Sequence, residues 1–130
     1  MRKMVSVVLL AVLLLLLAGC SKVSINGVSG SVVYDINGIC FEDTLTQEEL
    51  DAVVNVLDGK KQKSILSGVP SCGFSADVAI IVDGRRFALA CDKCGVLQNC
   101  STGGFIYVSD EERSVLEAIF TSRGGKFPCI

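Results

Sequence analysis

The side chains best suited to chemistry in this chain are those of its cysteines. Seven occur among 130 residues, and six of them follow residue 30. Thiols form disulfides in an oxidising compartment, act as redox pairs or ligate metals. Because six is an even number and the chain is small, we expect structural disulfides that stabilise the fold by about 2–4 kcal/mol each. The candidates are Cys40, Cys72, Cys91, Cys94, Cys100 and Cys129.

The position of the cysteines around a predicted hairpin favours one pairing. If Asp83-Gly84 is the turn, the chain that enters the hairpin at Cys72 lies near the segment that leaves it at Cys91 and Cys94. We therefore predict a bridge from Cys72 to Cys91 or Cys94. Cys129 lies on a short tail, and a bridge to the remaining member of that pair would hold the tail in place. The last predicted bridge joins Cys40 to Cys100.

Two other uses of these thiols are open. Cys91-Asp92-Lys93-Cys94 fits a redox CxxC motif, but Gly95 follows it and an antiparallel hairpin precedes it, where a redox motif has a βαβ unit. A tetrahedral metal site is the second alternative, although a second CxxC is missing and an oxidising compartment disfavours free thiolates. We expect no metal and no cofactor. The alternative metal ligands are Cys72, Cys91, Cys94 and Cys129.

Histidine is absent from the chain. This absence excludes Ser-His-Asp and Cys-His nucleophiles, His-ligated zinc and histidine general bases. Paired carboxylates could still act as acid and base, and Asp77, Asp83 and Asp92 surround the hairpin. Asp83 is better explained by its turn and Asp92 by exposure, so no nucleophile and base can be named. We expect the protein not to be an enzyme.

A β-hairpin is the clearest element that positions these groups. Two apolar runs between residues 77 and 90 alternate, and Asp83-Gly84 between them fits a two-residue type I′ turn. This turn predicts a register in which Val82 faces Arg85 and Ile80 faces Phe87.

Two helices are predicted from capping boxes. In a capping box, a hydroxyl and a carboxylate three residues apart each accept a hydrogen bond from an otherwise unbonded backbone N–H group. The two motifs are Thr46-Gln47-Glu48-Glu49 and Ser109-Asp110-Glu111-Glu112. Asp58-Gly59 and Gly124-Gly125 indicate where the helices end. Apolar residues three and four apart predict the buried positions, which are Leu50, Val53, Val54 and Leu57 in the first helix and Val115, Leu116, Ile119 and Phe120 in the second.

The predicted order of elements is a strand pair, a helix, a hairpin, a strand and a helix. The strand pair spans 31–36 and 39–41, with a tight turn at Asn37-Gly38 between the two strands. The later strand spans 105–108, and residues 60–72 form a loop. This order is typical of the α+β class. We predict a small antiparallel sheet, formed by the hairpin plus a third strand, with two amphipathic helices packed on one face and disulfides as staples. Residues 31–130 would form this single domain.

The N-terminus has the pattern of an export signal. Met1-Arg2-Lys3 is positively charged, residues 4–17 are apolar, and Leu17-Ala18-Gly19-Cys20 follows where a cleavage site belongs. Leu17-Ala18-Gly19-Cys20 resembles the lipobox of bacterial lipoproteins. The resemblance implies that residues 1–19 are removed as a signal peptide and that Cys20 carries lipid, including an acyl chain such as palmitate.

A lipid on Cys20 would determine where the protein acts. Several acyl chains on one residue hold a protein durably, so we expect anchoring to the bacterial cell membrane or outer membrane. Residues 20–30 would then be the lipidated cysteine and a flexible tether, because residues 21–30 contain three serines and two glycines without a clear period.

The net charge argues against a nucleic-acid partner. It is −2 for the whole chain and would become −4 once Arg2 and Lys3 are removed with the signal. The only dense basic cluster is Lys60, Lys61 and Lys63. Such a cluster could contact phosphate or anionic lipid, but we interpret it as the solvated end of a helix.

The second half of the chain carries a further resemblance. Three motifs carry it, namely Ser71-Cys72-Gly73-Phe74, the hairpin that runs into Cys91-Asp92-Lys93-Cys94, and Phe127-Pro128-Cys129. Together they resemble a group of small cysteine-containing bacterial lipoproteins with no assigned activity. The resemblance covers about residues 70–130 and implies an exported fold. By the order of its elements alone, the domain is also similar to small inhibitor-like α+β domains.

These observations predict a non-enzymatic interaction module at the cell envelope. Its sheet face or cysteine-bearing end would bind another envelope protein or a cell-wall component, because small residues on the outer sheet face would leave a flat surface. The residues proposed for this face are Ala79, Ile81, Arg86 and Ala88. The alternative is an extracytoplasmic thiol-redox or cysteine-ligated metal protein that uses Cys91 and Cys94.

Overall fold

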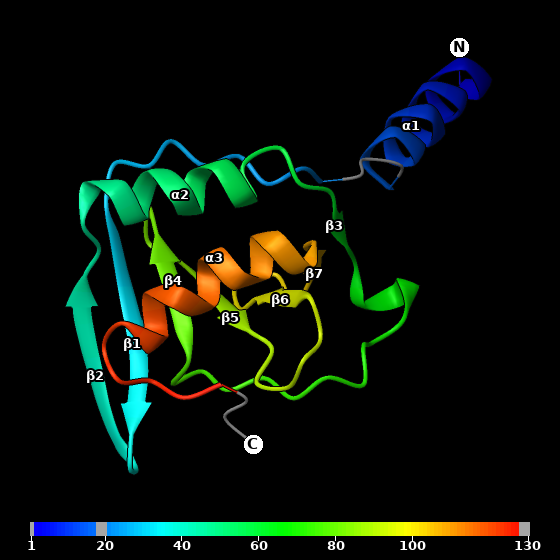
Figure 1. The fold of residues 1–130 in the computed structure, drawn as a ribbon. Coiled ribbons are helices and arrows are strands. Elements are labelled where there is room, and N and C mark those ends of the chain that lie inside the picture. The colour runs from blue at the N-terminus through cyan, green and yellow to red at the C-terminus, as the bar shows by residue number, and fades with distance from the viewer. Residues whose placement is uncertain (1, 18–20, 128–130) are drawn as a thin grey trace.

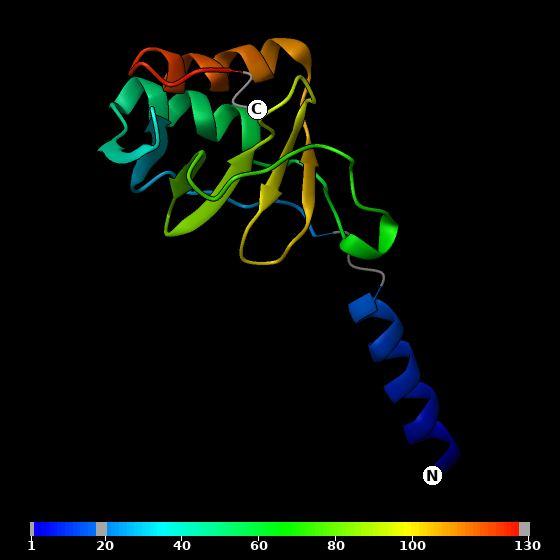
Figure 2. The same cartoon turned by 90° about the horizontal axis from the view of Figure 1, so that it is seen from below.

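The first element of the structure is a helix that stands apart from the rest of the chain. The computed structural model describes residues 2–17 and 21–127. Helix α1 (Arg2–Leu17) projects away from the other elements in both views of the fold (Figures 1 and 2). Within the described ranges, no helix combines the length and the apolar character needed to cross a membrane. The expected lipid site, Cys20, lies outside the described residues.

Seven antiparallel strands form one sheet. Their order is β2-β1-β4-β5-β6-β7-β3, so β2 and β3 are its two edges. The strands are β1 (Gly30–Ile36), β2 (Ile39–Thr44), β3 (Gln62–Lys63), β4 (Ala79–Val82), β5 (Arg85–Leu89), β6 (Val96–Asn99) and β7 (Phe105–Tyr107). The α+β class and the antiparallel sheet are confirmed, but the sheet is larger than predicted. The strand pair joins it through β1 and β4, and β6 and β3 were not predicted.

Both hairpin turns have the backbone that their sequences predict. Asn37 and Asp83 have positive φ angles of 55° and 51°, and the glycine after each has a φ of 84° and 78°. Two consecutive residues with positive φ define a type I′ turn, which matches the twist of the strands it joins. The register between β4 and β5 is as predicted, with Val82 opposite Arg85 and Ile80 opposite Phe87.

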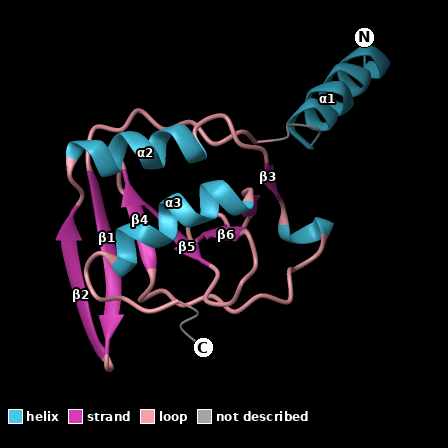
Figure 3. Cartoon of the chain, viewed as in Figure 1, coloured by secondary structure: helices cyan, strands magenta, loops and turns pink. Residues whose placement is uncertain are grey.

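Two helices form a layer on one face of the sheet (Figures 2 and 3). They are α2 (Gln47–Leu57) and α3 (Asp110–Thr121), and both predicted capping boxes are present. Val54 of α2 was predicted to be buried, but it is half-buried and lies next to Gly27 of the N-terminal segment. Val56 of the same helix is buried instead. Val115 of α3 is exposed, contrary to the prediction.

The core lies between the helices and the sheet. Ile80 and Val82 of β4 point to the same face, because alternate residues of a strand do so. The large, fully buried side chains that the other elements contribute to this core are Val32, Val53, Leu57, Phe87, Leu89, Leu97, Ile106, Leu116 and Phe120. Burial of each large apolar side chain contributes roughly 1.5–3 kcal/mol, so this layer supplies the main stabilisation of the fold.

Residues 21–29, which we expected to be a flexible tether, lie against the domain. Val23 and Ile25 are buried members of the core. The N–H of Val23 donates to the carbonyl of Lys60 at 2.9 Å, and the N–H of Gln62 donates to the carbonyl of Ser21 at 3.0 Å. These bonds leave little freedom for this part of the backbone. The packed domain therefore includes residues from Ser21 onward.

Candidate functional site

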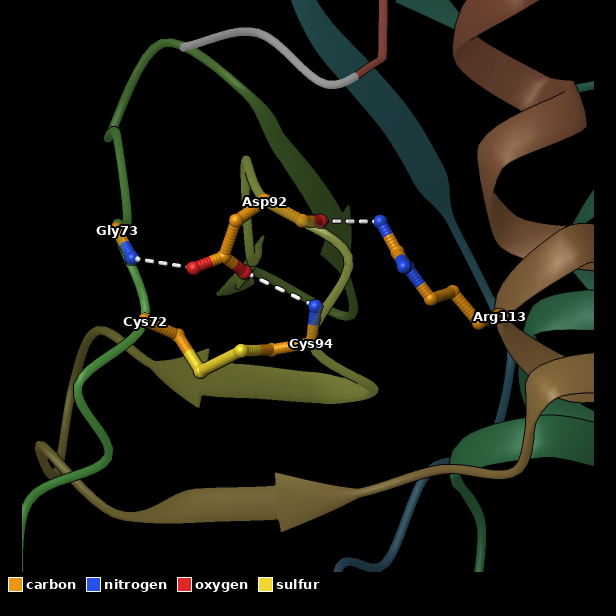
Figure 4. The surroundings of a disulfide bond; sticks show 5 residues. All are labelled: Cys72, Gly73, Asp92, Cys94 and Arg113. Atoms are coloured by element: carbon orange, nitrogen blue, oxygen red, sulfur yellow. Dashed lines mark hydrogen bonds between the residues drawn. A yellow bond between two sulfur atoms is a disulfide. The ribbon is translucent and has the colours of Figure 1, made fainter.

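One disulfide joins the loop before the hairpin to the segment after it. Cys72 is bonded to Cys94 with a Cα–Cα distance of 6.2 Å (Figure 4). This confirms the prediction that Cys72 pairs with one member of the CxxC motif. The bridge closes a loop whose ends are 22 residues apart in sequence, so it restricts the unfolded chain over the whole hairpin.

Asp92 organises the backbone around this disulfide (Figure 4). Its carboxylate accepts from the N–H of Gly73 at 3.3 Å and from the N–H of Cys94 at 3.0 Å. The side chain of Arg113 in α3 donates to the backbone carbonyl of Asp92 and pairs with Glu117 at 2.6 Å. Asp92 thus joins the two chain segments that the disulfide connects, and Arg113 connects these segments to the helix layer.

The CxxC cysteines do not form a pair with each other. Cys94 is bonded to Cys72, and Cys91 is buried and disulfide-bonded as well. A redox CxxC motif alternates between a dithiol and a disulfide within the motif. The pairing with Cys72 therefore differs from what that alternative requires. The predicted bridge to Cys129 involves a residue outside the described part of the chain.

Three possible metal ligands lie at the same place. The sulfurs of Cys72 and Cys94 and a carboxylate oxygen of Asp92 all lie within 4.8 Å of one another. The two sulfurs are bonded to each other, and a metal ion needs them as separate thiolates. A metal could therefore bind here only after reduction of the disulfide.

The predicted bridge between Cys40 and Cys100 is wrong, because both thiols are free and exposed. Cys40 lies in the edge strand β2, and Cys100 directly follows β6, four strands away across the sheet. Neighbouring strands are about 4.8 Å apart, so roughly 19 Å separates the two positions. A disulfide needs Cα atoms within about 7 Å.

The predicted interaction face offers less exposed surface than expected. Ala79 and Ala88 are buried, and Ile81 and Arg86 are half-buried. Arg86 donates to the carbonyl of Ala76 at 2.6 Å, which holds the loop before β4 near the hairpin. Phe105 lies in the same cross-strand row as Ala79 and Ala88, and its ring centre is 5.8 Å from that of Phe74 in this loop. The loop that contains Phe74 therefore lies against this face of the sheet.

A pocket lies between the end of β1, the loop before β4 and the segment after α3. Its volume is about 330 Å³. Polar groups come from Tyr34, Asp35, Asp77 and Lys126, while the apolar part of the wall comes from Ile36, Val78, Phe120 and Phe127. The Sγ atom of Cys40 in β2 is 4.0 Å from a carboxylate oxygen of Asp77, so a free thiol borders the pocket. This combination of an apolar wall and a few polar groups is typical of ligand sites.

An ionic cluster next to the pocket connects three elements. Arg123, just beyond α3, contacts Glu49 of α2 at 2.8 Å and Asp43 of β2 at 3.3 Å. The hydrogen bond from Arg123 holds the pKa of Glu49 below its ordinary value of 4.5. The hydroxyl of Tyr34 donates to Asp43 at 2.7 Å, and this bond raises the pKa of Tyr34 above 10.0. The cluster was not predicted, because its members are far apart in sequence.

The carboxylate of Asp83 binds the N-terminal segment. It accepts four backbone N–H groups, those of residues 26–29, at 2.8–3.3 Å. Desolvation opposes ionisation of this carboxyl, but the four hydrogen bonds outweigh it and lower the pKa of Asp83 below 3.8. The Asp83-Gly84 motif predicted only the local role of Asp83 in the turn. Its second role depends on residues more than fifty positions away in the chain.

No protein-family model, curated protein or solved structure matches the chain.

Proposed function

We propose that this protein is an exported lipoprotein, anchored in a bacterial cell membrane or outer membrane through Cys20, whose domain is a non-enzymatic interaction module. The observation that carries the proposal is the order of the N-terminal features. Helix α1 begins with the charged Arg2 and Lys3 and continues as an uncharged apolar run, Leu17-Ala18-Gly19-Cys20 follows, and the packed domain begins directly after it. A lipid on Cys20 would hold such a domain at a membrane surface.

The modification of Cys20 can be tested by mass. We expect the protein purified from bacterial membranes to have the mass of a chain that begins at Cys20, increased by a diacylglyceryl group and an amide-linked acyl chain. A C20S variant should keep residues 1–19 and carry no lipid. A Cys100→Ser variant, which removes an exposed free thiol elsewhere, should be processed normally. A wild-type mature chain without added lipid would refute the proposal.

The pocket and the neighbouring edge strand are the best candidates for the surface that binds a partner. Among the described residues no strand pairs with the outer side of β2, and Ile39, Cys40 and Phe41 are exposed. An extended segment of another protein can add to such an edge through backbone hydrogen bonds, while side chains enter adjacent pockets. The partner would be an envelope protein or a cell-wall component, and no nucleic acid is expected, given the net charge of −2.

This surface can be tested by photocrosslinking in living cells. A photoreactive residue in place of Ile39 should give a discrete crosslinked product, and the same residue in place of Val115, which is also exposed, should not. Equal crosslinking at both positions, or none at Ile39, would argue against the β2 edge.

The second candidate function is a thiol-redox or metal protein that uses Cys91 and Cys94. The proximity of Cys72, Asp92 and Cys94 favours it, since these side chains could bind a metal once reduced. Alkylation without reductant should label Cys40 and Cys100 only, and native mass spectrometry should detect no bound ion, if the cysteines around the hairpin are structural. Labelling of Cys91 or Cys94, or a bound metal ion, would favour the second candidate.

A further inference from the structure

An ordered apolar turn lies next to the edge strand β3. The 3-10 turn η1 (Ile65–Ser67) leaves Leu66 98% exposed, and Ile65 and Val69 are exposed by more than half. Two hydrogen bonds stabilise the turn, one from the N–H of Leu66 to the hydroxyl of Ser64 at 3.1 Å and one from the N–H of Gly68 to the carbonyl of Ile65 at 3.2 Å. Adjacent exposed apolar side chains indicate a contact surface. We refer to Ile65, Leu66 and Val69 as the apolar turn.

Three lysines that have no carboxylate partner among the described residues lie in or beside β3, the strand that precedes this turn. Lys22 and Lys61 face each other across an antiparallel bridge, an arrangement in which like charges repel. Lys63 lies two residues further on, with its Nζ atom 4.7 Å from the centre of the Tyr107 ring. Lys60 pairs with Glu112, but no ion pair within residues 2–17 and 21–127 includes the other three. We refer to Lys22, Lys61 and Lys63 as the basic group.

The same edge carries the start of the packed domain. The carbonyl of Ser21, the residue after Cys20, accepts a hydrogen bond from the N–H of Gln62 in β3. Ile65 is three residues beyond Gln62, so at most about 11 Å of chain separates them. In both views of the fold, β3 and the apolar turn lie at one end of the domain, and β1 and β2 lie at the other (Figures 1 and 2). A lipid on Cys20 would emerge beside the apolar turn and the basic group.

We propose that this edge of the domain rests on an anionic lipid bilayer. The apolar turn enters the lipid, the basic group binds the headgroups, and the half-exposed Tyr107 lies at the interface, where tyrosine is favoured. The inference rests on the lipid anchor proposed at Cys20. Because residues 21–29 are bonded to the domain and do not form a flexible linker, the anchor determines the orientation of the domain. The β2 edge, six strand spacings or about 29 Å away, then points away from the membrane toward partners.

The absence of tryptophan from the chain allows a direct test. The L66W variant would carry the sole tryptophan at the apolar turn, and the matched I39W variant would carry it at the exposed β2 edge. Each full chain is produced in bacteria, purified from membranes and reconstituted in phosphatidylcholine vesicles that contain phosphatidylglycerol and brominated acyl chains. We expect the tryptophan of L66W to emit at shorter wavelength and to be quenched by bromine, and that of I39W to remain unquenched.

Each outcome separates the orientation from the lipid anchor. Vesicle-bound L66W protein whose tryptophan is not quenched would overturn the inference and leave the anchor intact. The same holds for a blue shift without quenching, which would mean that another protein, and not lipid, covers the turn. Quenching of L66W without lipid on Cys20 would refute the anchor but support the orientation. Equal quenching of L66W and I39W would also overturn the inference.

The basic group is tested in the same system. Replacement of Lys61 and Lys63 by glutamate in the L66W background should lower the ratio of inserted to free turn by at least about fivefold for each lysine in vesicles with phosphatidylglycerol. In vesicles of phosphatidylcholine alone, the substitutions should have little effect. An equal loss in both lipids would contradict the role of anionic headgroups.

Discussion

At the residue scale, two carboxylates have roles that depend on contacts between distant segments. Asp83 occupies a hairpin turn and also binds the backbone of residues 26–29, while Glu49 completes a helix cap and also binds Arg123. A carboxylate with several donors is stabilised in its charged form. Both groups therefore couple local structure to packing, and their ionisation contributes to stability.

The D83N variant should loosen the N-terminal segment. Asparagine is favoured in a type I′ turn, so the hairpin should remain, but the neutral amide has one acceptor oxygen instead of two. We expect faster hydrogen exchange of the amides of residues 26–29, with little change at Val23, whose N–H donates to Lys60. Asp35→Asn, in the other hairpin, is the matched control. Unchanged exchange of residues 26–29 would show that Asp83 does not hold them.

The stability of the protein should fall as Glu49 becomes protonated. The pKa of Glu49 is lower in the folded protein than its ordinary value of 4.5. The stabilisation is therefore fully present above 4.5 and is lost as the pH falls through the folded pKa. The E49Q variant should be less stable by about 1 kcal/mol at neutral pH and should lose less stability in acid than wild type. Urea unfolding at both pH values measures this, with E48Q as the exposed control. Equal acid sensitivity of E49Q and wild type would contradict it.

At the element scale, local signals determine where each helix starts and each hairpin turns. Both capping boxes form with the predicted partners, and both type I′ turns occur at the predicted residues. These motifs satisfy backbone groups within a few residues, so they depend little on the rest of the chain. The short strands β3 and β6 lack such signals, and they form because neighbouring strands supply their hydrogen bonds.

The caps should contribute measurably to stability. Removal of the hydroxyl in T46A leaves the N–H of Glu49 without its acceptor, and S109A does the same at Glu112. We expect each variant to lose about 1 kcal/mol of unfolding free energy, measured by urea denaturation. S114A, a hydroxyl substitution inside α3, should change stability by less. A loss below that of S114A would show that the caps are not required.

At the scale of the whole molecule, the crosslink and the loop before the hairpin determine which surfaces are exposed. The loop before β4 lies against one face of the sheet, where Arg86 binds the carbonyl of Ala76. The Cys72–Cys94 disulfide attaches this loop to the segment after β5. With the N-terminal segment packed against the domain, the β2 edge and the edge beside β3 remain exposed.

The loss of the crosslink should cost more than the loss of two free thiols. A bridge between residues 22 positions apart is expected to contribute about 3 kcal/mol. The double variant C72A/C94A should lose about this amount in urea unfolding under oxidising conditions, whereas C40A/C100A, which removes the exposed free thiols, should lose little. Equal losses in the two double variants would mean that the bridge does not stabilise the fold.

The sequence alone determined the features that depend on neighbours in the chain. Short-range pattern predicts the helix starts at Thr46 and Ser109 and the turns at Asn37-Gly38 and Asp83-Gly84. It also predicts the β4–β5 register and the region in which Cys72 finds its partner. The tertiary structure decided which exposed-looking residues are buried, because burial of Ala79 and Ala88 depends on where a distant loop lies. It also separated Cys40 from Cys100 across four strands and brought residues 26–29 to Asp83. Such contacts close long loops, and no local periodicity records which of them forms.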